Sequence, residues 1–263
     1  MDDRLRQLQL AELEILDEFV RVCEIHGLRY YLIGGTLLGA VRHQGFIPWD
    51  DDIDVVMPRA DYDQLAAIWP ESAAPEYFYQ CPNTDPFYYL TYAKIRKNGT
   101  EVYEERFRDA RFHKGIFIDV FPLDDCPRPG PAAHLLFNVL AVMNYRGQID
   151  SGESYKPYRE LSGKIGYALL RVFGKKQLVK VRREFLSLSA KLGKGAYLAS
   201  YSGAYGYYKE VYPASWFGAG KRLRFETRDY TVPGAYELVL QQAYGTDYLI
   251  PKKDSNKHVE IDE

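Results

Sequence analysis

The sequence of 263 residues has few cysteines, no long hydrophobic run and almost no excess charge. Its three cysteines, Cys23, Cys81 and Cys126, are odd in number and widely spaced. This spacing argues against a disulfide framework and a paired zinc site and indicates reduced, buried thiols. The longest apolar run, residues 135–143, is far shorter than the roughly 20 residues that span a bilayer. Any membrane contact should therefore be peripheral.

The charge balance and the N-terminal residues exclude two further classes. The formal net charge is −2, which provides no general attraction to nucleic acid, so we expect no nucleic-acid partner. Asp2, Asp3 and Arg4 precede a charged amphipathic stretch instead of an apolar segment. This arrangement does not predict a signal peptide, and we expect a cytoplasmic protein.

What the sequence does contain is a series of short β-strand patterns and amphipathic helices. Apolar residues at helical spacing from Leu5 to Cys23 predict an opening helix that ends at Gly27. We predict an α/β (α+β) fold with a mixed β-sheet and flanking helices in residues 1–126, and a helical, tyrosine-rich C-terminal part packed on it in residues 127–263. The predicted strands are 30–33, 53–57, 88–96, 101–103 and 116–121, and the later helices are 59–68, 132–145, 158–172, 175–192 and a short C-terminal one.

A glycine pair follows the first predicted strand. Gly34 and Gly35 stand where a helix should begin, at Thr36 or Leu37. Glycines at such a point allow the backbone to approach a phosphate and direct its N–H groups toward it. The alternative is an ordinary strand-to-helix turn. The pair alone does not decide between the two.

Paired carboxylates follow in the second predicted strand. Because side chains alternate along a strand, Asp52 and Asp54 should share one face while Ile53 enters the core. Two adjacent carboxylates suit Mg²⁺. A solvated acidic loop would have no reason to interleave strand formers such as Val55, and a calcium loop would need a glycine and a distal glutamate that are absent here.

Asp119 is a third candidate, within the apolar predicted strand 116–121. A carboxylate buried there is costly unless it has a metal ion or a hydrogen-bond donor as partner. Alternatively, Asp119 caps a turn before Pro122, a common role for aspartate. Asp124 and Asp125 are expected to lie in a loop.

The order of these features resembles that of the nucleotidyltransferase superfamily. Residues 33–42 and 45–55 closely resemble the LicD family of phosphocholine and related phosphotransferases, to which fukutin and fukutin-related protein are related. Further similarity follows at 94–96, 115–124 and 232–251. One departure is Gly245-Thr246-Asp247, where many members have Gly-Asp.

The resemblance implies a nucleotidyltransferase-like core and a catalytic set of Asp52, Asp54 and Asp119. These would hold two Mg²⁺ ions, with Mn²⁺ as the alternative, across the diphosphate of CDP-choline or another CDP-alcohol. The alcohol phosphate would pass to a hydroxyl of a cell-surface glycan precursor, often lipid-linked in this family, with release of CMP. Two alternatives remain: a nucleotidyltransferase that modifies a small molecule and releases pyrophosphate, and an inactive glycan-binding protein of the same fold.

Phosphate binding also needs positive charge and N–H donors. Lys94 and Arg96 are two apart on a predicted strand and share a face, where an arginine could bind phosphate through two hydrogen bonds; a solvated strand face is the alternative. The residues expected to bind the nucleotide are Gly34, Gly35, Thr36, Arg42, Lys94 and Arg96.

Aromatic residues suggest how an alcohol such as choline would be bound. A quaternary ammonium binds over aromatic faces, although most of the 23 tyrosines must serve in packing or sugar stacking. The residues expected to contact substrate are Trp49, Asp51, Tyr205, Tyr207, Tyr208 and Trp216.

A basic amphipathic stretch, residues 171–194, has two interpretations. Its apolar residues recur at three- and four-residue spacing from Leu178 to Leu192. Such a helix either lies on an anionic membrane, which would place the protein on the inner face, or packs this stripe on the core.

Overall fold

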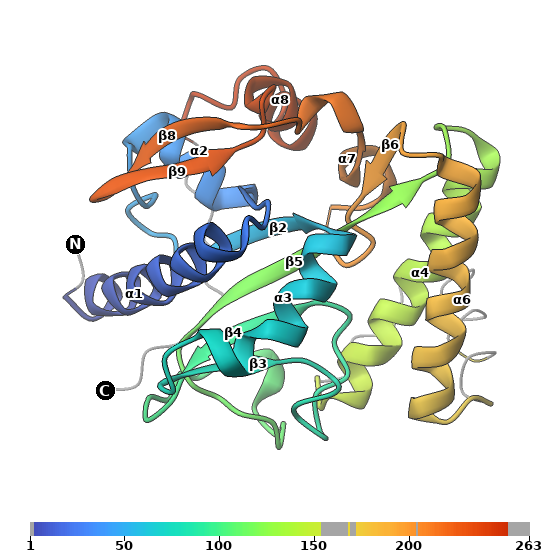
Figure 1. The fold of residues 1–263 in the computed structure, drawn as a ribbon, viewed down its shortest axis with the longest axis horizontal. Helices are drawn as coiled ribbons and strands as arrows, with labels where there is room; N and C mark the ends of the chain where they lie inside the picture. Colours follow the sequence, from blue (N-terminus) through green and yellow to red (C-terminus); the bar gives the residue numbers. More distant parts are fainter. Residues whose placement is uncertain (1–2, 154–167, 169–171, 204, 252–263) are drawn as a thin grey trace.

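The computed structural model describes residues 3–153, 168, 172–203 and 205–251, and it contains a mixed sheet flanked by helices (Figure 1). Strands β2 and β5 pair in parallel, and their other neighbours pair antiparallel. This architecture confirms the predicted α+β class. The sheet has the order β1–β2–β5–β4–β3 and comprises β1 (Tyr31–Leu32), β2 (Asp54–Pro58), β3 (Tyr77–Gln80), β4 (Ala93–Lys97) and β5 (Phe117–Cys126).

Two helices pack against the sheet and against each other. Helix α1 (Asp3–His26) buries one side fully, including Leu16 and Phe19, and α3 (Arg59–Ser72) buries Leu65. The chain leaves α1 at Gly27, whose φ of 65° is the left-handed conformation favoured by glycine after a helix. Both helices confirm the sequence prediction because their periodicity is local.

The central strands differ in part from the prediction. β4 begins at Ala93, since residues 88–92 lie outside the sheet, and 101–103 is not a strand. Tyr88, Leu90 and Tyr92 occur at every second position, which resembles a strand, but they pack in a separate apolar cluster with Phe107 and Phe112. β3 was not predicted.

Strand β5 is longer than predicted and runs through Asp124 and Asp125. The expectation that these two residues lie in a loop is therefore wrong. Asp124 is buried and forms an ion pair of 2.7 Å with Arg59 of α3, which compensates its charge. The far half of β5 pairs with β6 (Tyr197–Ala199), and β6 pairs with β7 (Val211–Pro213).

The C-terminal part adds helices and a hairpin around this sheet (Figure 1). The predicted helix at 158–172 falls almost entirely outside the described residues. The hairpin was not predicted, whereas the helices at 132–145 and 175–192 and the short C-terminal helix were. The C-terminal elements are α4 (Pro131–Asp150), α6 (Lys175–Gly193), α7 (Tyr207–Glu210), the hairpin β8 (Lys221–Phe225) and β9 (Arg228–Val232), and α8 (Tyr236–Tyr244). Helix α2 (Gly34–His43) belongs to the N-terminal part.

The hairpin completes the main core instead of forming a separate one. Phe225, Tyr230 and Val232 are fully buried in the same cluster as Leu16 and Phe19 of α1. The N-terminal and C-terminal parts of the chain therefore share one hydrophobic core.

Helix α6 uses part of its apolar stripe for packing. Leu178, Val181 and Phe185 pack in the cluster between α4, α6 and β6, while Leu188 and Leu192 are exposed. The packing interpretation accounts for the first three residues. No helix in the described ranges combines the length and apolar character needed to cross a bilayer. The three cysteines are buried with free thiols, as predicted.

Candidate active site

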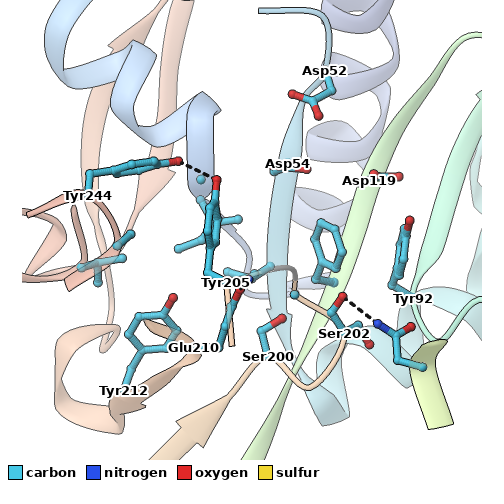
Figure 2. Close-up of a pocket in the computed structure, with 18 of the residues that line it drawn as sticks. Asp52, Asp54, Tyr92, Asp119, Ser200, Ser202, Tyr205, Glu210, Tyr212 and Tyr244 are labelled. Carbon is cyan, nitrogen blue, oxygen red and sulfur yellow. Dashed lines mark hydrogen bonds between the residues drawn. The ribbon is translucent and has the colours of Figure 1, made fainter. Parts of the chain in front are cut away.

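A pocket opens where β2, β5 and the first turn of α2 meet the C-terminal elements (Figure 2). Its empty volume, including the part open to solvent, is about 1040 Å³. Acids line one part of the wall and tyrosines another. Gly34, Asp52, Asp54 and Asp119 all border the pocket.

The glycine pair forms the first turn of α2, slightly earlier than predicted. Gly34 has a φ of 59°, and a Cβ there would lie 2.8 Å from Oδ2 of Asp54. A Cβ on Gly35 would lie 2.7 Å from Oδ2 of Asp50. The backbone of Asp54 donates a hydrogen bond of 2.8 Å to Oγ1 of Thr36. The glycines and Thr36 therefore fit directly against the acidic segment.

Asp54 and Asp119 face each other across the parallel pair β2 and β5. The amide of Asp119 donates to the carbonyl of Ile53 at 2.8 Å, which extends the pairing to the residue before the start of β2. Asp52 precedes β2 instead of lying within it, yet it borders the same pocket (Figure 2). The structure thus brings the three predicted carboxylates together.

Residues Asp50, Asp51, Asp52, Asp54 and Asp119 form an acid site, in which the pKa values of Asp50 and Asp54 are raised. Burial raises the pKa of Asp54 well above its usual range, and the charges of Asp52 and Asp119 raise it further. Burial and the neighbouring Asp52 and Asp51 raise the pKa of Asp50 to about 8. A bound cation would neutralise these carboxylates and offset the cost of their crowding.

The acid site has the donor set of a divalent-cation site. Carboxylate oxygens of Asp50, Asp51 and Asp52 lie within 4.8 Å of one another, and hard anionic oxygens suit Mg²⁺. Behind them, Glu12 of α1 is buried, and its Oε2 has no hydrogen-bond partner in the described part of the chain. Burial and the charge of Asp52 raise the pKa of Glu12. The residues present therefore fit a bound metal ion.

The two predicted strand cations are both buried. Nζ of Lys94 lies 2.8 Å from Oδ1 of Asp119 and 3.7 Å from Glu104. Burial lowers the pKa of Lys94, although these two carboxylates oppose the shift. Arg96 donates hydrogen bonds to Gln80 and to the carbonyl of Gly115. Lys94 therefore contacts an acid of the site from behind, and Arg96 is not among the residues that line the pocket.

Two other arginines occupy different places. Arg42 donates a hydrogen bond of 3.3 Å to the carbonyl of Tyr248 and does not line the pocket. Arg106, which the sequence analysis missed, does line it. Burial disfavours the charge of Arg106, but Tyr92 and Glu104 outweigh this effect and raise its pKa. Arg106 is recognised as a pocket residue only from the structure, because it lies in no motif of the sequence.

Of the aromatic residues expected to contact substrate, only Tyr205 borders the pocket. The ring of Tyr207 packs on His134, and Tyr208 is 78% exposed. Trp49 and Trp216 are partly buried against the main core. Asp51 is buried within the acidic segment. Tyr212, Tyr244 and Glu210, which were not in this expected set, line the pocket instead.

Sequence similarity relates this chain to one family of known proteins. A family model described as LicD/FKTN/FKRP, nucleotidyltransferase domain, matches residues 27–126. The lipopolysaccharide cholinephosphotransferase LicD of Haemophilus influenzae is 30% identical over 260 residues, which cover 97% of this chain and 95% of that protein. The chain belongs to the LicD family.

More distant similarity is confined to segments. The human ribitol 5-phosphate transferase FKRP is 58% identical to this LicD-family chain over 36 residues, which cover 14% of this chain and 7% of FKRP. An uncharacterized protein of Rickettsia prowazekii is 34% identical over 76 residues, or 27% of this chain and 29% of that protein. Membership of the LicD family confirms the resemblance seen in the sequence motifs.

Proposed function

We propose that this protein transfers phosphocholine, or a related alcohol phosphate, from a CDP-alcohol to a hydroxyl of a cell-surface glycan precursor and releases CMP. The observation that carries the proposal is the meeting of Asp52, Asp54 and Asp119 with the first turn of α2 at one pocket, in a chain similar over nearly its full length to a cholinephosphotransferase. The acids and the N-terminal turn of α2 supply the metal ligands and the phosphate-binding backbone that phosphoryl transfer uses.

Different residues at the pocket would bind the diphosphate and support the catalytic acids. Gly34 and Gly35 let the diphosphate approach the N-terminus of α2, whose N–H groups favour negative charge. Arg106 provides a positive charge at the pocket wall, where a planar guanidinium binds phosphate oxygens well. Lys94 stabilises ionised Asp119 from behind through the ion pair of 2.8 Å.

The reaction forms a bond between the acceptor hydroxyl oxygen and the phosphorus of the alcohol phosphate. The bond from that phosphorus to the bridging oxygen breaks, CMP leaves with the electron pair, and the hydroxyl proton passes to a carboxylate of the acid site. Asp52, Asp54 and Asp119 would hold Mg²⁺ or Mn²⁺, which neutralises the diphosphate and stabilises the departing CMP.

The test is incubation of the protein and Mg²⁺ with a glycan acceptor and a panel of CDP-choline, CDP-ethanolamine, CDP-glycerol and CDP-ribitol. We expect CMP release with at least one donor and its loss in Asp54→Asn. Release of pyrophosphate from a nucleoside triphosphate, without CMP release from any donor, would instead indicate a nucleotidyltransferase. Absence of both reactions would favour a glycan-binding protein.

A further inference from the structure

One charged side chain of the pocket is not used by the proposed reaction. Glu210 ends α7 and is 5% exposed, yet its carboxylate borders the pocket away from the acids on β2 and β5 (Figure 2). In the described residues, no lysine, arginine or histidine lies within ion-pair distance of Glu210. A buried carboxylate without a counter-charge is costly, so its retention here requires a reason.

The local structure holds the Glu210 carboxylate in a defined position. Its Oε1 accepts a hydrogen bond of 3.1 Å from the amide of Tyr205. A Cβ on Gly203 would collide with the same oxygen, so the carboxylate in this position packs directly on the backbone of Gly203. The adjacent Lys209 does not neutralise it; its ammonium lies 5.6 Å from the centre of the Tyr205 ring.

Three tyrosines line the pocket beside this carboxylate (Figure 2). The rings of Tyr205 and Tyr244 meet edge to face, with centroids 5.9 Å apart and hydroxyls 3.2 Å apart. Tyr212 is 3% exposed and packs on Phe217. The three rings come from the loop before α7, from β7 and from α8.

This combination selects for one kind of cation. A quaternary ammonium has no N–H to donate, so hydrogen-bond acceptors alone do not hold it, whereas aromatic faces and a nearby negative charge do. A primary ammonium would need several acceptors, and a neutral polyol could donate hydroxyl hydrogen bonds to the carboxylate but would lack the cation's attraction to the aromatic faces. The pocket also contains the proposed phosphate site, so a cation here would be linked to the phosphate through a short chain.

We propose that Glu210, Tyr205, Tyr212 and Tyr244 bind the trimethylammonium group of a phosphocholine donor and thereby select choline over neutral alcohols. This proposal rests on the proposed function for the identity of the donor. It replaces the aromatic set expected from the sequence, of which only Tyr205 is retained, and it adds a carboxylate that no motif indicated.

The test measures binding to the full-length protein separately from turnover. Calorimetric titrations with CDP-choline, CDP-ethanolamine and CDP-glycerol would compare the wild type with Glu210→Gln and Tyr244→Leu. We expect Glu210→Gln to weaken CDP-choline binding at least tenfold, which corresponds to about 1.4 kcal/mol, and CDP-glycerol binding less than twofold. Tyr244→Leu should weaken CDP-choline more than CDP-ethanolamine, because the latter gains less from aromatic faces.

Two control variants separate this site from general effects. Glu237→Gln removes an exposed carboxylate of α8 that does not line the pocket, and Tyr208→Leu removes an exposed tyrosine. Both should bind CDP-choline as the wild type does. If Tyr208→Leu discriminates between donors and Tyr244→Leu does not, the aromatic set predicted from the sequence is right and ours is wrong.

The outcomes distinguish the two proposals. CMP release with an unchanged choline-to-glycerol preference in Glu210→Gln would overturn the ammonium site and leave the proposed function intact. Selective binding of CDP-choline without any CMP release would support the site and contradict the function. Equal weakening of both donors, or no CDP-choline binding by the wild type, would overturn the site. If Glu210→Gln does not fold, Tyr244→Leu decides, since it leaves the contact between Glu210 and Gly203 unchanged.

Discussion

Asp54 and Asp119 are direct partners in the parallel pairing of β2 and β5. This register places two carboxylates side by side although they are far apart in sequence, and burial together with Asp52 and Asp119 raises the pKa of Asp54. In the proposed reaction these charges converge on the diphosphate. The first prediction tests that arrangement.

Asp52→Asn and Asp54→Asn should each reduce CMP release at least tenfold while the protein still folds. The loss follows because each removes a charge that would hold the metal ion at the reacting phosphates. Rates from steady-state assays would be compared with those of Asp63→Asn, an exposed acid of α3. More than about a tenth of the wild-type rate in either variant, where tenfold is roughly 1.4 kcal/mol, would contradict the metal assignment.

Gly34→Ala should reduce turnover far more than Gly27→Ala. Both glycines have left-handed φ values, 59° and 65°, so each variant should lose roughly 1–2 kcal/mol of stability. Only the new Cβ at Gly34 meets Asp54, whereas that at Gly27 meets nothing within 4 Å. Melting temperatures and CMP release would be measured for both. Similar turnover in the two variants would show that Gly34 is merely a turn residue.

Arg106→Gln should weaken binding of CDP-choline and CDP-glycerol by the same factor, about tenfold. The reason is that Arg106 borders the pocket and would contact phosphate, which the two donors share. Arg108→Gln, which removes a neighbouring exposed arginine, is the control in the same titrations. A loss confined to CDP-choline would place Arg106 near the alcohol instead.

CDP-choline affinity should increase as the pH rises through about 7. Burial raises the pKa of Glu210 from 4.5 to about 7, opposed by the Tyr205 amide and Lys209. Below this pH the carboxyl is protonated and loses its attraction for the ammonium. Tyr205, Tyr212 and Tyr244 have pKa values raised by burial and remain neutral throughout.

Glu210→Gln should remove this pH dependence, and CDP-glycerol should show little of it. The comparison with CDP-glycerol also removes the effect of the acid site, whose titration is common to both donors. The stability of the fold should depend on pH in the opposite direction to the affinity for CDP-choline. A raised folded-state pKa means that the wild type loses stability as the pH rises from about 4.5 to about 7. The melting temperature of Glu210→Gln should change less over this range.

Glu12→Gln should raise the melting temperature of the metal-free protein at neutral pH and reduce the increase caused by Mg²⁺. Burial and the charges of Asp52 and Asp51 raise the pKa of Glu12, so ionisation of Glu12 opposes folding until a cation compensates it. Thermal melts with and without MgCl₂ would measure both effects. A lower melting temperature without metal would instead show that Glu12 makes a structural contact.

The sequence predicts those parts of the fold that depend on local pattern. Helix α1 follows from its apolar periodicity, and β2 from the alternation of acids with Val55. The hairpin of β8 and β9 escapes detection because Lys221 and Arg222 at its start resemble a surface segment. Residues 88–92 were predicted as a strand because burial of every second side chain gives the same sequence pattern in a loop as in a strand.

For the site, sequence motifs identify the acids but not their partners. Lys94 could have been a phosphate ligand or a solvated residue from sequence alone, and the structure buries it against Asp119 and Glu104. Glu210 lies in no recognisable motif, and its contacts with Gly203 and the amide of Tyr205 appear only in the folded chain. Such pairings depend on tertiary contacts between distant segments, which local spacing does not encode.

The turn between β8 and β9 has a consequence for how the protein is made. Glu226 in that turn accepts hydrogen bonds from Arg6 of α1 and from the amide of Phe46, which precedes the acidic segment. A growing chain emerges from the ribosome N-terminus first, so the acids are synthesised well before this residue. The contact of Glu226 with the start of this segment forms only when the hairpin arrives, and we expect nascent chains that stop before Glu226 to remain inactive.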